Sequence, residues 1–263
     1  MKYKNIAIIA AKDNEEAVSK KDLLVKKYNF TDLTSNHSNL QNIDLVVAIG
    51  GDGLMLHLLH DFENHIVPIY GINCGTVGFL MNSFNQDNFL SAIEAAKESL
   101  IYPLRVTAID ENDKKHNYIA INEAYLLRQT SQIAKIKIEI GGHIRIKNLM
   151  ADGVLVATAA GSTAYNLSVG GPIIPFGSDI LAITPISPFR PRRWRGALLA
   201  SNSKIRFEIL DYKTRPTSAV ADYNEIRNVK EVIVEEDRSI CFKILFDPHH
   251  SLEERIISEQ FAN

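Results

Sequence analysis

The chain has 263 residues, of which 46% are hydrophobic and 23% are charged, and its formal net charge is −2 at pH 7. These values are ordinary for a globular protein with a substantial core, and the length suits one large domain or two modest ones. A net charge this close to zero gives no general attraction to nucleic acid or to acidic membranes, so neither is expected as a partner.

Two features predict a cytoplasmic protein. The two cysteines, Cys74 and Cys241, are far apart and match no metal-ligand spacing, so we expect free thiols in a reducing compartment. The first ten residues have the pattern of a strand, and they are too few for a signal sequence or a membrane span.

The first hundred residues alternate between strand and helix patterns. Strands are expected over residues 6–10, 45–49 and 66–72, and helices over residues 14–28, 54–60 and 88–99, with a polar loop over 31–41. This alternation predicts an α/β domain with a Rossmann-like parallel sheet over residues 1–102. Ligands of such sheets bind beyond the carboxyl ends of the strands.

Strand patterns dominate from residue 103 to residue 245. They cover residues 118–127, 133–140, 143–147, 154–159, 204–210 and 231–246, and Gly141-Gly142 marks a hairpin. Consecutive strands of this kind predict a β-rich sandwich domain. The tail, residues 246–263, contains an amphipathic segment over 251–261 that predicts a helix.

The first chemical candidate is the glycine turn Gly50-Gly51-Asp52-Gly53, which lies between a buried strand and a helix. Glycine lets backbone N–H groups approach a ligand closely, and the beginning of a helix favours anions, so the turn suits phosphate. A carboxylate repels phosphate unless it handles a proton or a metal. The alternative is an ordinary Asp-Gly turn.

Two further candidates lie in the β-rich region. An apolar strand joins Asp152-Gly153 to Gly161-Ser162-Thr163, whose N–H groups and hydroxyls suit a polar ligand, and Tyr165 could stack on a flat ring or pack in the core. Asn122-Glu123 interrupts another apolar strand, where it could hold a ribose diol or a base amino group. The alternative is an edge strand with Glu123 in solvent.

Taken in order, these motifs resemble the NAD kinase family: Gly-Gly-Asp-Gly, then Asn-Glu, then Asp-Gly with Gly-Ser-Thr-Ala-Tyr and Gly-Gly-Pro-Ile. The resemblance implies transfer of the ATP γ-phosphate to the 2′-hydroxyl of the adenosine ribose of NAD, giving NADP and ADP. It also implies a divalent metal cation, usually Mg²⁺, an active site between the two domains, a C-terminal tail that returns to the N-terminal domain, and a homo-oligomer, either dimer or tetramer.

The resemblance also implies residue roles. Asp52 corresponds to the general base, and Gly50, Gly51 and Gly53 would lie at phosphate. No metal ligand is assigned. The residues expected to bind NAD are Asp52, Gly53, His57, Phe79, Asn122, Glu123, Asp152, Thr163, Ala164, Tyr165, Asn166, Leu167, Ser168, Ser187 and Asp222. Among these, Asp152 corresponds to the nicotinamide ligand, and Ser187 falls where a neighbouring subunit is expected to contribute.

Several positions depart from the family pattern. Leu54 stands where the family often has threonine, Ala159-Ala160 replaces Pro-Thr, and Met150 replaces a basic residue. The arginine cluster over residues 190–195 is a solvated loop, an oligomer contact or a phosphate-binding loop.

Two other functions are compatible with parts of the pattern. A diacylglycerol-kinase-like lipid kinase would use the same glycine turn, but the sequence contains no basic amphipathic helix for a membrane surface. A non-catalytic NAD(P)-binding sensor would explain the departures at Leu54 and Ala159-Ala160, but it would have no need for Asp52.

Overall fold

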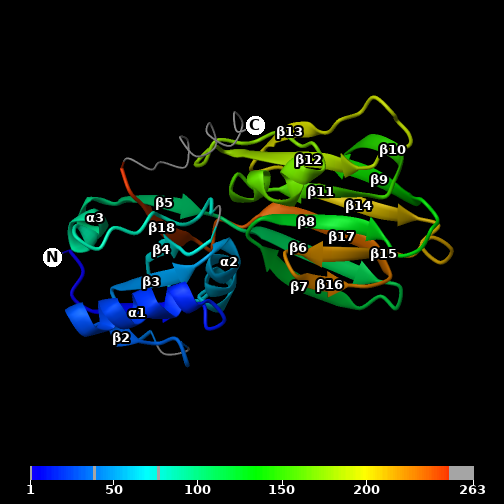
Figure 1. The fold of residues 1–263 in the computed structure, drawn as a ribbon. Coiled ribbons are helices and arrows are strands. Elements are labelled where there is room, and N and C mark those ends of the chain that lie inside the picture. Colours follow the sequence, from blue (N-terminus) through cyan, green and yellow to red (C-terminus); the bar gives the residue numbers. More distant parts are fainter. Residues whose placement is uncertain (1, 38–39, 76–77, 249–263) are drawn as a thin grey trace. The chain divides into compact units, whose positions relative to one another are not determined.

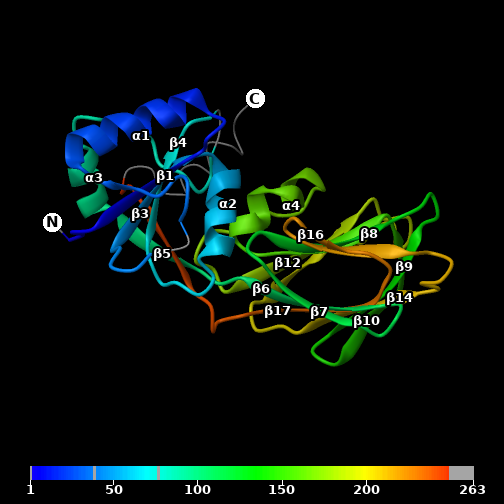
Figure 2. The same cartoon turned by 90° about the horizontal axis from the view of Figure 1, so that it is seen from below.

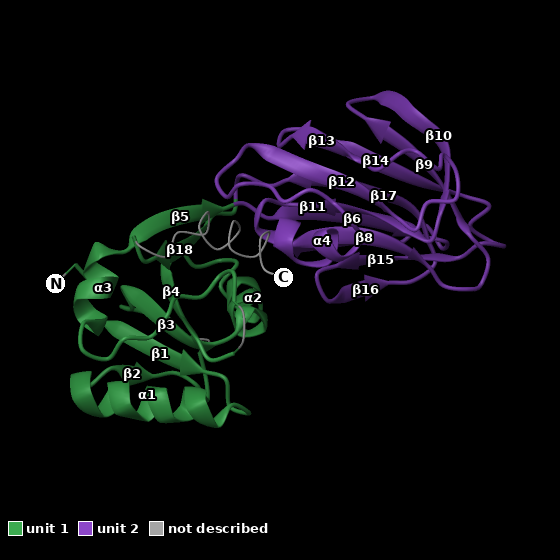
Figure 3. Ribbon diagram, turned by 45° about the horizontal axis from the view of Figure 1, so that its top comes forward, with its two compact units in different colours: residues 1–101, 240–263 green, residues 102–239 purple. Residues whose placement is uncertain are grey.

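The computed structural model of the chain describes residues 2–37, 40–75 and 78–248 and divides into two units (Figure 3). Unit 1 comprises Met1–Ile101 and Ile240–Asn263, and unit 2 comprises Tyr102–Ser239. The expected division placed residues up to 245 in the second domain, whereas the strand over 242–246 joins the sheet of unit 1.

Unit 1 is built on a six-stranded sheet in the order β2-β1-β3-β4-β18-β5 (Figure 1). The first five strands are mutually parallel and β5 is antiparallel to β18, so the sheet is mixed and not purely parallel as predicted. The strands are β1 (Ile6–Ala10), β2 (Thr31–Asp32), β3 (Leu45–Gly50), β4 (Ile69–Asn73), β5 (Lys97–Ile101) and β18 (Phe242–Phe246).

Helices cover both faces of this sheet. They are α1 (Glu15–Tyr28), α2 (Asp52–Asp61) and α3 (Phe89–Ala95) (Figure 2). Leu24 of α1 and Phe89 of α3 pack in one cluster with the sheet residues on their side. On the other face Met55 of α2 lies against Gly71, where a Cβ atom would be 2.7 Å from the Met55 Cε atom. The bare Gly71 therefore lets α2 sit close on the sheet.

Two predictions for unit 1 were partly wrong. The expected helix over 88–99 ends at Ala95, because residues 97–101 extend and pair with β18. The expected loop over 31–41 begins with the short strand β2, which pairs with β1. The expected helix over 251–261 lies outside the described residues. The predicted strands over 6–10 and 45–49 and the helix over 14–28 are confirmed, with Asn14 as the N-cap that accepts the Ala17 N–H at 3.0 Å.

Unit 2 consists of two antiparallel six-stranded sheets with the orders β10-β9-β14-β17-β6-β7 and β13-β12-β11-β8-β15-β16. The strands of the first sheet are β6 (Leu104–Asp110), β7 (Lys115–Ala120), β9 (Ala134–Ile140), β10 (His143–Ala151), β14 (Ile205–Leu210) and β17 (Val229–Glu236). The strands of the second are β8 (Glu123–Arg128), β11 (Gly153–Ala157), β12 (Ile180–Ile186), β13 (Ala197–Ala200), β15 (Thr217–Ala221) and β16 (Asn224–Ile226).

One hydrophobic core joins the two sheets, as a sandwich requires. It includes alternate residues of each sheet, such as Val106 and Phe207 from the first and Leu126 and Val154 from the second. The predicted hairpin at Gly141-Gly142 is confirmed, and both glycines have positive φ (58° and 78°), which a two-residue hairpin turn favours. On the outer face of the second sheet, a short 3₁₀ helix (Ala160–Thr163) and α4 (Tyr165–Ser168) follow β11.

Two strand predictions for this region were wrong in their extent. The expected strand over 118–127 is two strands, β7 and β8, which belong to different sheets and are separated at Ile121-Asn122. The expected strand over 231–246 is also two, β17 in unit 2 and β18 in unit 1. In both cases an unbroken apolar pattern hides the point at which the chain leaves one sheet for another.

Candidate active site

The carboxylate of Asp52 is held by the backbone of the loop that follows β4 and includes Phe79 and Leu80, called the second loop below. Strand β3 ends at Gly50, and Asp52 is the first residue of α2. Its Oδ2 atom accepts the Phe79 N–H at 2.8 Å, and its Oδ1 atom accepts the Leu80 N–H at 3.0 Å. These two donors orient the carboxylate, and a carboxylate oxygen can accept more than one hydrogen bond.

The glycines around Asp52 serve different purposes. Gly50 is buried, and a Cβ atom there would lie 2.9 Å from the Leu54 Cδ2 atom, so its small size is needed for packing. Gly51 and Gly53 face open space, because a Cβ atom added at either position would meet no atom within 4 Å. A Cβ atom on Gly78 would lie 3.3 Å from the Asp52 Oδ1 atom. A ligand can therefore come close to the backbone at Gly51 and Gly53. The missing side chain of Gly78 lets the second loop come close to Asp52.

The base of the second loop is fixed by α1 and β3. The Cys74 N–H donates to the Gly50 carbonyl at 2.7 Å, and the Asn14 side chain donates to the Cys74 carbonyl at 2.9 Å. Lys20 Nζ donates to the Asn73 carbonyl at 3.3 Å. Burial raises the pKa of the Cys74 thiol, so this cysteine is a packing residue in a neutral state. Its place in the loop is structural.

The two other residues of unit 1 that were predicted to bind NAD are Phe79 and His57. Phe79 is half-buried, and its N–H is one of the two donors to Asp52. His57 lies on α2, one helical turn beyond Gly53 and on the same face.

In unit 2, the carboxylate of Asp222 organises the break between β7 and β8. Asp222 occupies the turn between β15 and β16 with a positive φ of 51°. Its carboxylate accepts the N–H groups of Ile121 at 2.7 Å, Asn122 at 3.0 Å and Glu123 at 3.2 Å. The three predicted residues Asn122, Glu123 and Asp222 are therefore brought together, and Asp222 acts on the other two through their backbone.

Glu123 is buried and incompletely paired. Only 7% of the residue is exposed, and its Oε2 atom has no hydrogen-bond partner among the described residues. Burial, and then the negative charge of Asp222, raise the pKa of Glu123 to about 8, against the opposing effect of a hydrogen bond from the Tyr165 N–H. The alternative of an edge strand with Glu123 in solvent is therefore wrong, because β8 lies between β11 and β15.

Thr158 is a buried residue whose role the sequence did not reveal. Its hydroxyl contacts the carbonyls of Ile121 at 2.7 Å and Asn122 at 3.2 Å, and it accepts the Gly161 N–H at 3.1 Å. A Cβ atom on Gly161 would lie only 2.1 Å from the Asn122 carbonyl oxygen. Thr158 and Gly161 thus lock the segment after β11 onto Asn122. A threonine three residues before a glycine, immediately after a buried strand, is the local signal for such a cap.

The residues of the predicted segment from Thr163 to Ser168 differ in their exposure to solvent. Thr163, Ala164 and Tyr165 are half-buried, and Leu167 and Ser168 are exposed. The Tyr165 ring packs edge-on against Tyr125 of β8, with 5.2 Å between the ring centroids. Asn166 is fully buried. Its side-chain NH₂ group donates to the carbonyls of Ser162 and Pro172, and its side-chain oxygen accepts from the Thr184 hydroxyl. The Asn166 side chain therefore stabilises the fold.

Asp152 and Ser187 lie at the other end of β11. Glu123 is paired with Ala157, and Asp152 precedes Gly153, so that about 13 Å of strand separates the two ends. The Asp152 Oδ1 atom pairs with Arg128 Nε at 2.5 Å, and the Asp152 N–H donates to the Ile186 carbonyl. Within one copy of unit 2, Asp152 and Ser187 therefore lie at the opposite end of the strand from Glu123. The charge of Asp152 still acts on Tyr165, whose pKa is raised by burial and then by Glu123 and Asp152.

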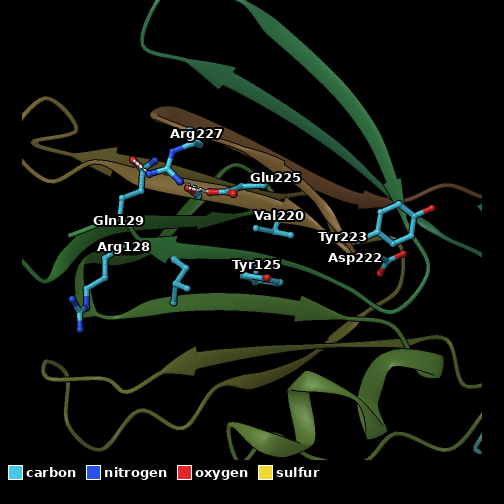
Figure 4. Close-up of a pocket in the computed structure, with 10 residues that line it drawn as sticks. Tyr125, Arg128, Gln129, Val220, Asp222, Tyr223, Glu225 and Arg227 are labelled. Atoms are coloured by element: carbon cyan, nitrogen blue, oxygen red, sulfur yellow. Dashed lines mark hydrogen bonds and ion pairs between the residues drawn. The ribbon is translucent and has the colours of Figure 1, made fainter. Parts of the chain in front are cut away.

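An open hollow of about 450 Å³ runs along the outer face of β8, β15 and β16 (Figure 4). Its lining has Asp222 and Tyr223 at one end and Arg128 at the other (Figure 4). Between them, Arg227 donates to Glu225 at 3.2 Å and to Gln129 at 3.3 Å. The hollow is polar and begins beside the Asn122–Asp222 group.

Every residue of the arginine cluster over residues 190–195 is exposed except Trp194, which is half-buried. The guanidinium groups of Arg190 and Arg192 lie 5.6 and 5.3 Å from the centre of the Phe189 ring. These contacts give the loop a defined surface, and its three alternative roles remain predictions.

Within residues 2–37, 40–75 and 78–248, no group of three or more His, Cys, Asp or Glu side chains could hold a metal ion. Nor does any helix in this part of the chain have the length and apolar content needed to cross a bilayer.

Comparison with known proteins places these features in a family. The family model of the ATP-NAD kinase N-terminal domain matches residues 4–100, and that of the ATP-NAD kinase C-terminal domain matches residues 121–234. The NAD kinase of Caulobacter vibrioides is 53% identical over 222 residues, which are 84% of this chain and 85% of that protein. The NAD kinase of Brucella suis is 46% identical over 264 residues and covers the whole of both chains.

Solved structures show the same fold at low sequence identity. Yeast NADH kinase in complex with NADH has a TM-score of 0.81 at 23% identity, covering 98% of this chain and 87% of that one. An NAD kinase from Archaeoglobus fulgidus in complex with ATP has a TM-score of 0.76 at 23% identity, covering 97% and 98%.

The two units of the chain match the N-terminal and C-terminal domain models of ATP-NAD kinase, so the protein is a two-domain nucleotide kinase. More specifically, the chain belongs to the NAD kinase family. It is an enzyme that phosphorylates NAD with ATP, and the comparisons support neither the lipid kinase nor the sensor alternative.

Proposed function

We propose that the enzyme transfers the γ-phosphate of ATP to the 2′-hydroxyl of the adenosine ribose of NAD, with Asp52 as the general base. The supporting observation is the pair of N–H bonds from Phe79 and Leu80, which hold the carboxylate in one orientation. A ribose hydroxyl is a very weak acid, so the proton leaves as the bond to phosphorus forms and not before. Asp52 receives this proton at a carboxylate oxygen.

We further propose that unit 2 holds the dinucleotide. Asn122 and Glu123 would contact a ribose or the base, Tyr165 and its neighbours from Thr163 to Ser168 would enclose the adenosine, and Asp222 would fix the backbone of residues 121–123. In this proposal Asp52 of unit 1 and the Glu123 group of unit 2 act on the same NAD molecule.

The phosphate side of the reaction would lie at Gly51 and Gly53, where no side chain occupies the space beside the backbone. A divalent cation, Mg²⁺, would neutralise phosphate charge. Mg²⁺ is commonly held by one or two carboxylates together with substrate phosphates, and the absence of a three-ligand cluster in the described residues fits a cation that arrives with ATP. We assign it no protein ligand.

Three wider features are also part of the proposal. Asp152 would bind the nicotinamide, and in a homo-oligomer Ser187 would be contributed to the site by a neighbouring subunit. The chain after β18 would return to unit 1, where β18 itself pairs with β4. The unpaired Cys74 and Cys241 support a cytoplasmic location.

The direct test is to incubate the purified protein with ATP, Mg²⁺ and NAD and to measure NADP with an NADP-specific dehydrogenase. NADP should form in proportion to enzyme and time, and its 2′-phosphate should be distinguished from the 3′-isomer by chromatography. A folded preparation that forms no NADP above background would contradict the proposal. A 3′-phosphate would contradict the assigned position of transfer.

A further inference from the structure

The carboxyl group of Glu123 lacks the partners that a buried charge requires. The residue is 7% exposed, and its Oε2 atom has no hydrogen-bond partner within the described part of the chain. Burying an ionised carboxylate is costly unless it is paired and hydrogen-bonded, whereas the neutral acid is much cheaper to bury. The empty site therefore favours the protonated form.

The groups that face Glu123 act in the same direction. The Asp222 carboxylate, in the β15–β16 turn, opposes a second negative charge. From α4, the Tyr165 N–H donates a hydrogen bond that favours ionisation, and Tyr125 of β8 packs its ring against Tyr165. No ion pair of Glu123 occurs among the described residues, and Arg128 on the same strand is engaged by Asp152. Burial and Asp222 together raise the pKa of Glu123 to about 8.

What is missing at Oε2 is a hydrogen-bond donor, and a dinucleotide carries several. A ribose diol offers two O–H groups on adjacent carbons, and the adenine amino group offers two N–H bonds. Donors of this kind stabilise the ionised carboxylate, which can accept more hydrogen bonds than the acid can.

We propose that Glu123 is a neutral carboxylic acid in the empty site and that it loses its proton to solvent when NAD binds and donates hydrogen bonds to it. The O–H bond of the acid breaks and its proton passes to the buffer, while the ligand keeps its own protons. The inference rests on the proposed dinucleotide site. It adds that NAD binding is coupled to proton release at one identified residue.

The coupling has a measurable consequence for affinity. Below pH 7 most molecules carry the proton, so the apparent Kd for NAD should fall roughly tenfold for each unit of rising pH, and it should level off above about pH 8. NAD itself has no group that titrates in this range, so the dependence belongs to the protein.

The experiment is titration calorimetry of the full chain with NAD, without ATP and with EDTA to remove divalent cations. Measurements at pH 6, 7 and 8, each in two buffers with different ionisation enthalpies, give both the Kd and the number of protons exchanged. Close to one proton should be released per NAD at pH 7. Glu123→Gln should bind NAD with no proton release and with a Kd that does not change with pH.

Glu235→Gln is the matched control, because Glu235 is a partly exposed glutamate on β17 that pairs with Lys204. It should behave like the wild type. A second measurement needs no variant: a carboxylic-acid carbonyl band in the infrared difference spectrum should disappear when NAD binds.

The inference is overturned if the wild-type Kd is constant between pH 6 and 8, or if proton release persists in Glu123→Gln. A different result would show that Glu123 is not part of the NAD-binding site. If Glu123→Gln and Glu123→Ala both bind NAD as the wild type does at every pH, while the wild type still forms NADP, then NAD binds elsewhere and the kinase function stands.

Discussion

Asp52 in unit 1 and Glu123 in unit 2 are both carboxylates expected to contact NAD, yet their surroundings are opposite. Asp52 is half-buried, and each of its oxygens accepts a backbone N–H. Glu123 is almost fully buried, one of its oxygens has no protein partner within the described residues, and a second carboxylate faces it. Backbone N–H groups orient both oxygens of the Asp52 carboxylate, whereas one oxygen of the Glu123 carboxyl group has no such donor among the described residues.

The backbone donors account for this difference. In unit 1 the bare Gly78 lets the next two N–H groups reach Asp52. In unit 2 the N–H groups of residues 121–123 all donate to Asp222. The Glu123 carboxyl group accepts a hydrogen bond from the Tyr165 N–H, but its Oε2 atom has no donor among the described residues. A catalytic base and a binding group can thus be distinguished by where nearby N–H groups are directed.

The largest effect is expected from Asp52→Asn, which removes the proposed base. Turnover should fall by about 10²- to 10⁴-fold in a steady-state assay of NADP formation, because the amide cannot take the ribose proton. The Kd for NAD should stay within a few-fold of the wild type. Asp61→Asn, at the other end of α2, is the control and should retain wild-type turnover. Comparable turnover in Asp52→Asn would show that the base is another group.

The stability of Glu123→Gln relative to the wild type should depend on pH. The folded-state pKa of Glu123, about 8, lies above the ordinary value of 4.5, so between these values the folded protein binds the extra proton. The free energy of unfolding of the wild type should therefore fall as pH rises from 5 to 8, and the variant should gain about 2–4 kcal/mol relative to it. Denaturant unfolding at several pH values measures this, and a constant difference would mean that Glu123 is ionised throughout.

Gly161→Ala should disrupt the contact that places Asn122. The added Cβ atom would overlap the Asn122 carbonyl oxygen, which is backbone and cannot rotate away. We expect a loss of about 1–3 kcal/mol in the free energy of unfolding and at least about tenfold weaker NAD binding. Gly75→Ala is the control for unfolding, since its Cβ atom would meet only Asn73 Oδ1 at 3.7 Å. Wild-type NAD affinity in Gly161→Ala would show that Asn122 does not touch the ligand.

Thr158→Val should have a smaller effect of the same kind. It keeps the shape of the side chain but leaves the Gly161 N–H and the Ile121 carbonyl without their partner, at a cost of about 1–2 kcal/mol. Thr107→Val, at a half-exposed threonine of β6, should change stability by less than about 0.5 kcal/mol. Equal losses in the two variants, measured by denaturant unfolding, would remove Thr158 from the account of the site.

The smallest change in stability is expected from Asp152→Asn. Its ion pair with Arg128 joins side chains that are about one-third exposed, and such pairs contribute less than about 1 kcal/mol. If Asp152 binds the nicotinamide, the variant should still weaken NAD binding several-fold. Unchanged affinity would confine Asp152 to its structural pair.

Local patterns in the sequence predicted most of the elements but not the sheets to which they belong. The apolar run over 231–246 reads as one strand because β17 and β18 have the same alternation, although they pair in different units. The break at Ile121-Asn122 depends on Asp222, about a hundred residues away in the chain. Pairing over such distances leaves no mark in a local window.

The site shows the same limit. The glycine turn, the Asn-Glu pair and the block after Asp152 were recognisable as motifs, and the comparisons confirm the family to which they point. The motifs did not reveal that Glu123 is buried, that Thr158 joins Asn122 to Gly161, or that Asp152 lies at the far end of its strand. These facts depend on which strands are neighbours in the sheets, and local sequence patterns do not reveal strand pairing.

The most direct test of the division between the two carboxylates is to measure turnover and NAD affinity on the same preparations of Asp52→Asn and Glu123→Gln. The account predicts that Asp52→Asn binds NAD but does not phosphorylate it, and that Glu123→Gln alters NAD binding and removes its pH dependence. Asp52→Asn with near wild-type turnover, or with NAD affinity lost in parallel with turnover, would contradict the assignment of proton transfer to Asp52 and of binding to Glu123.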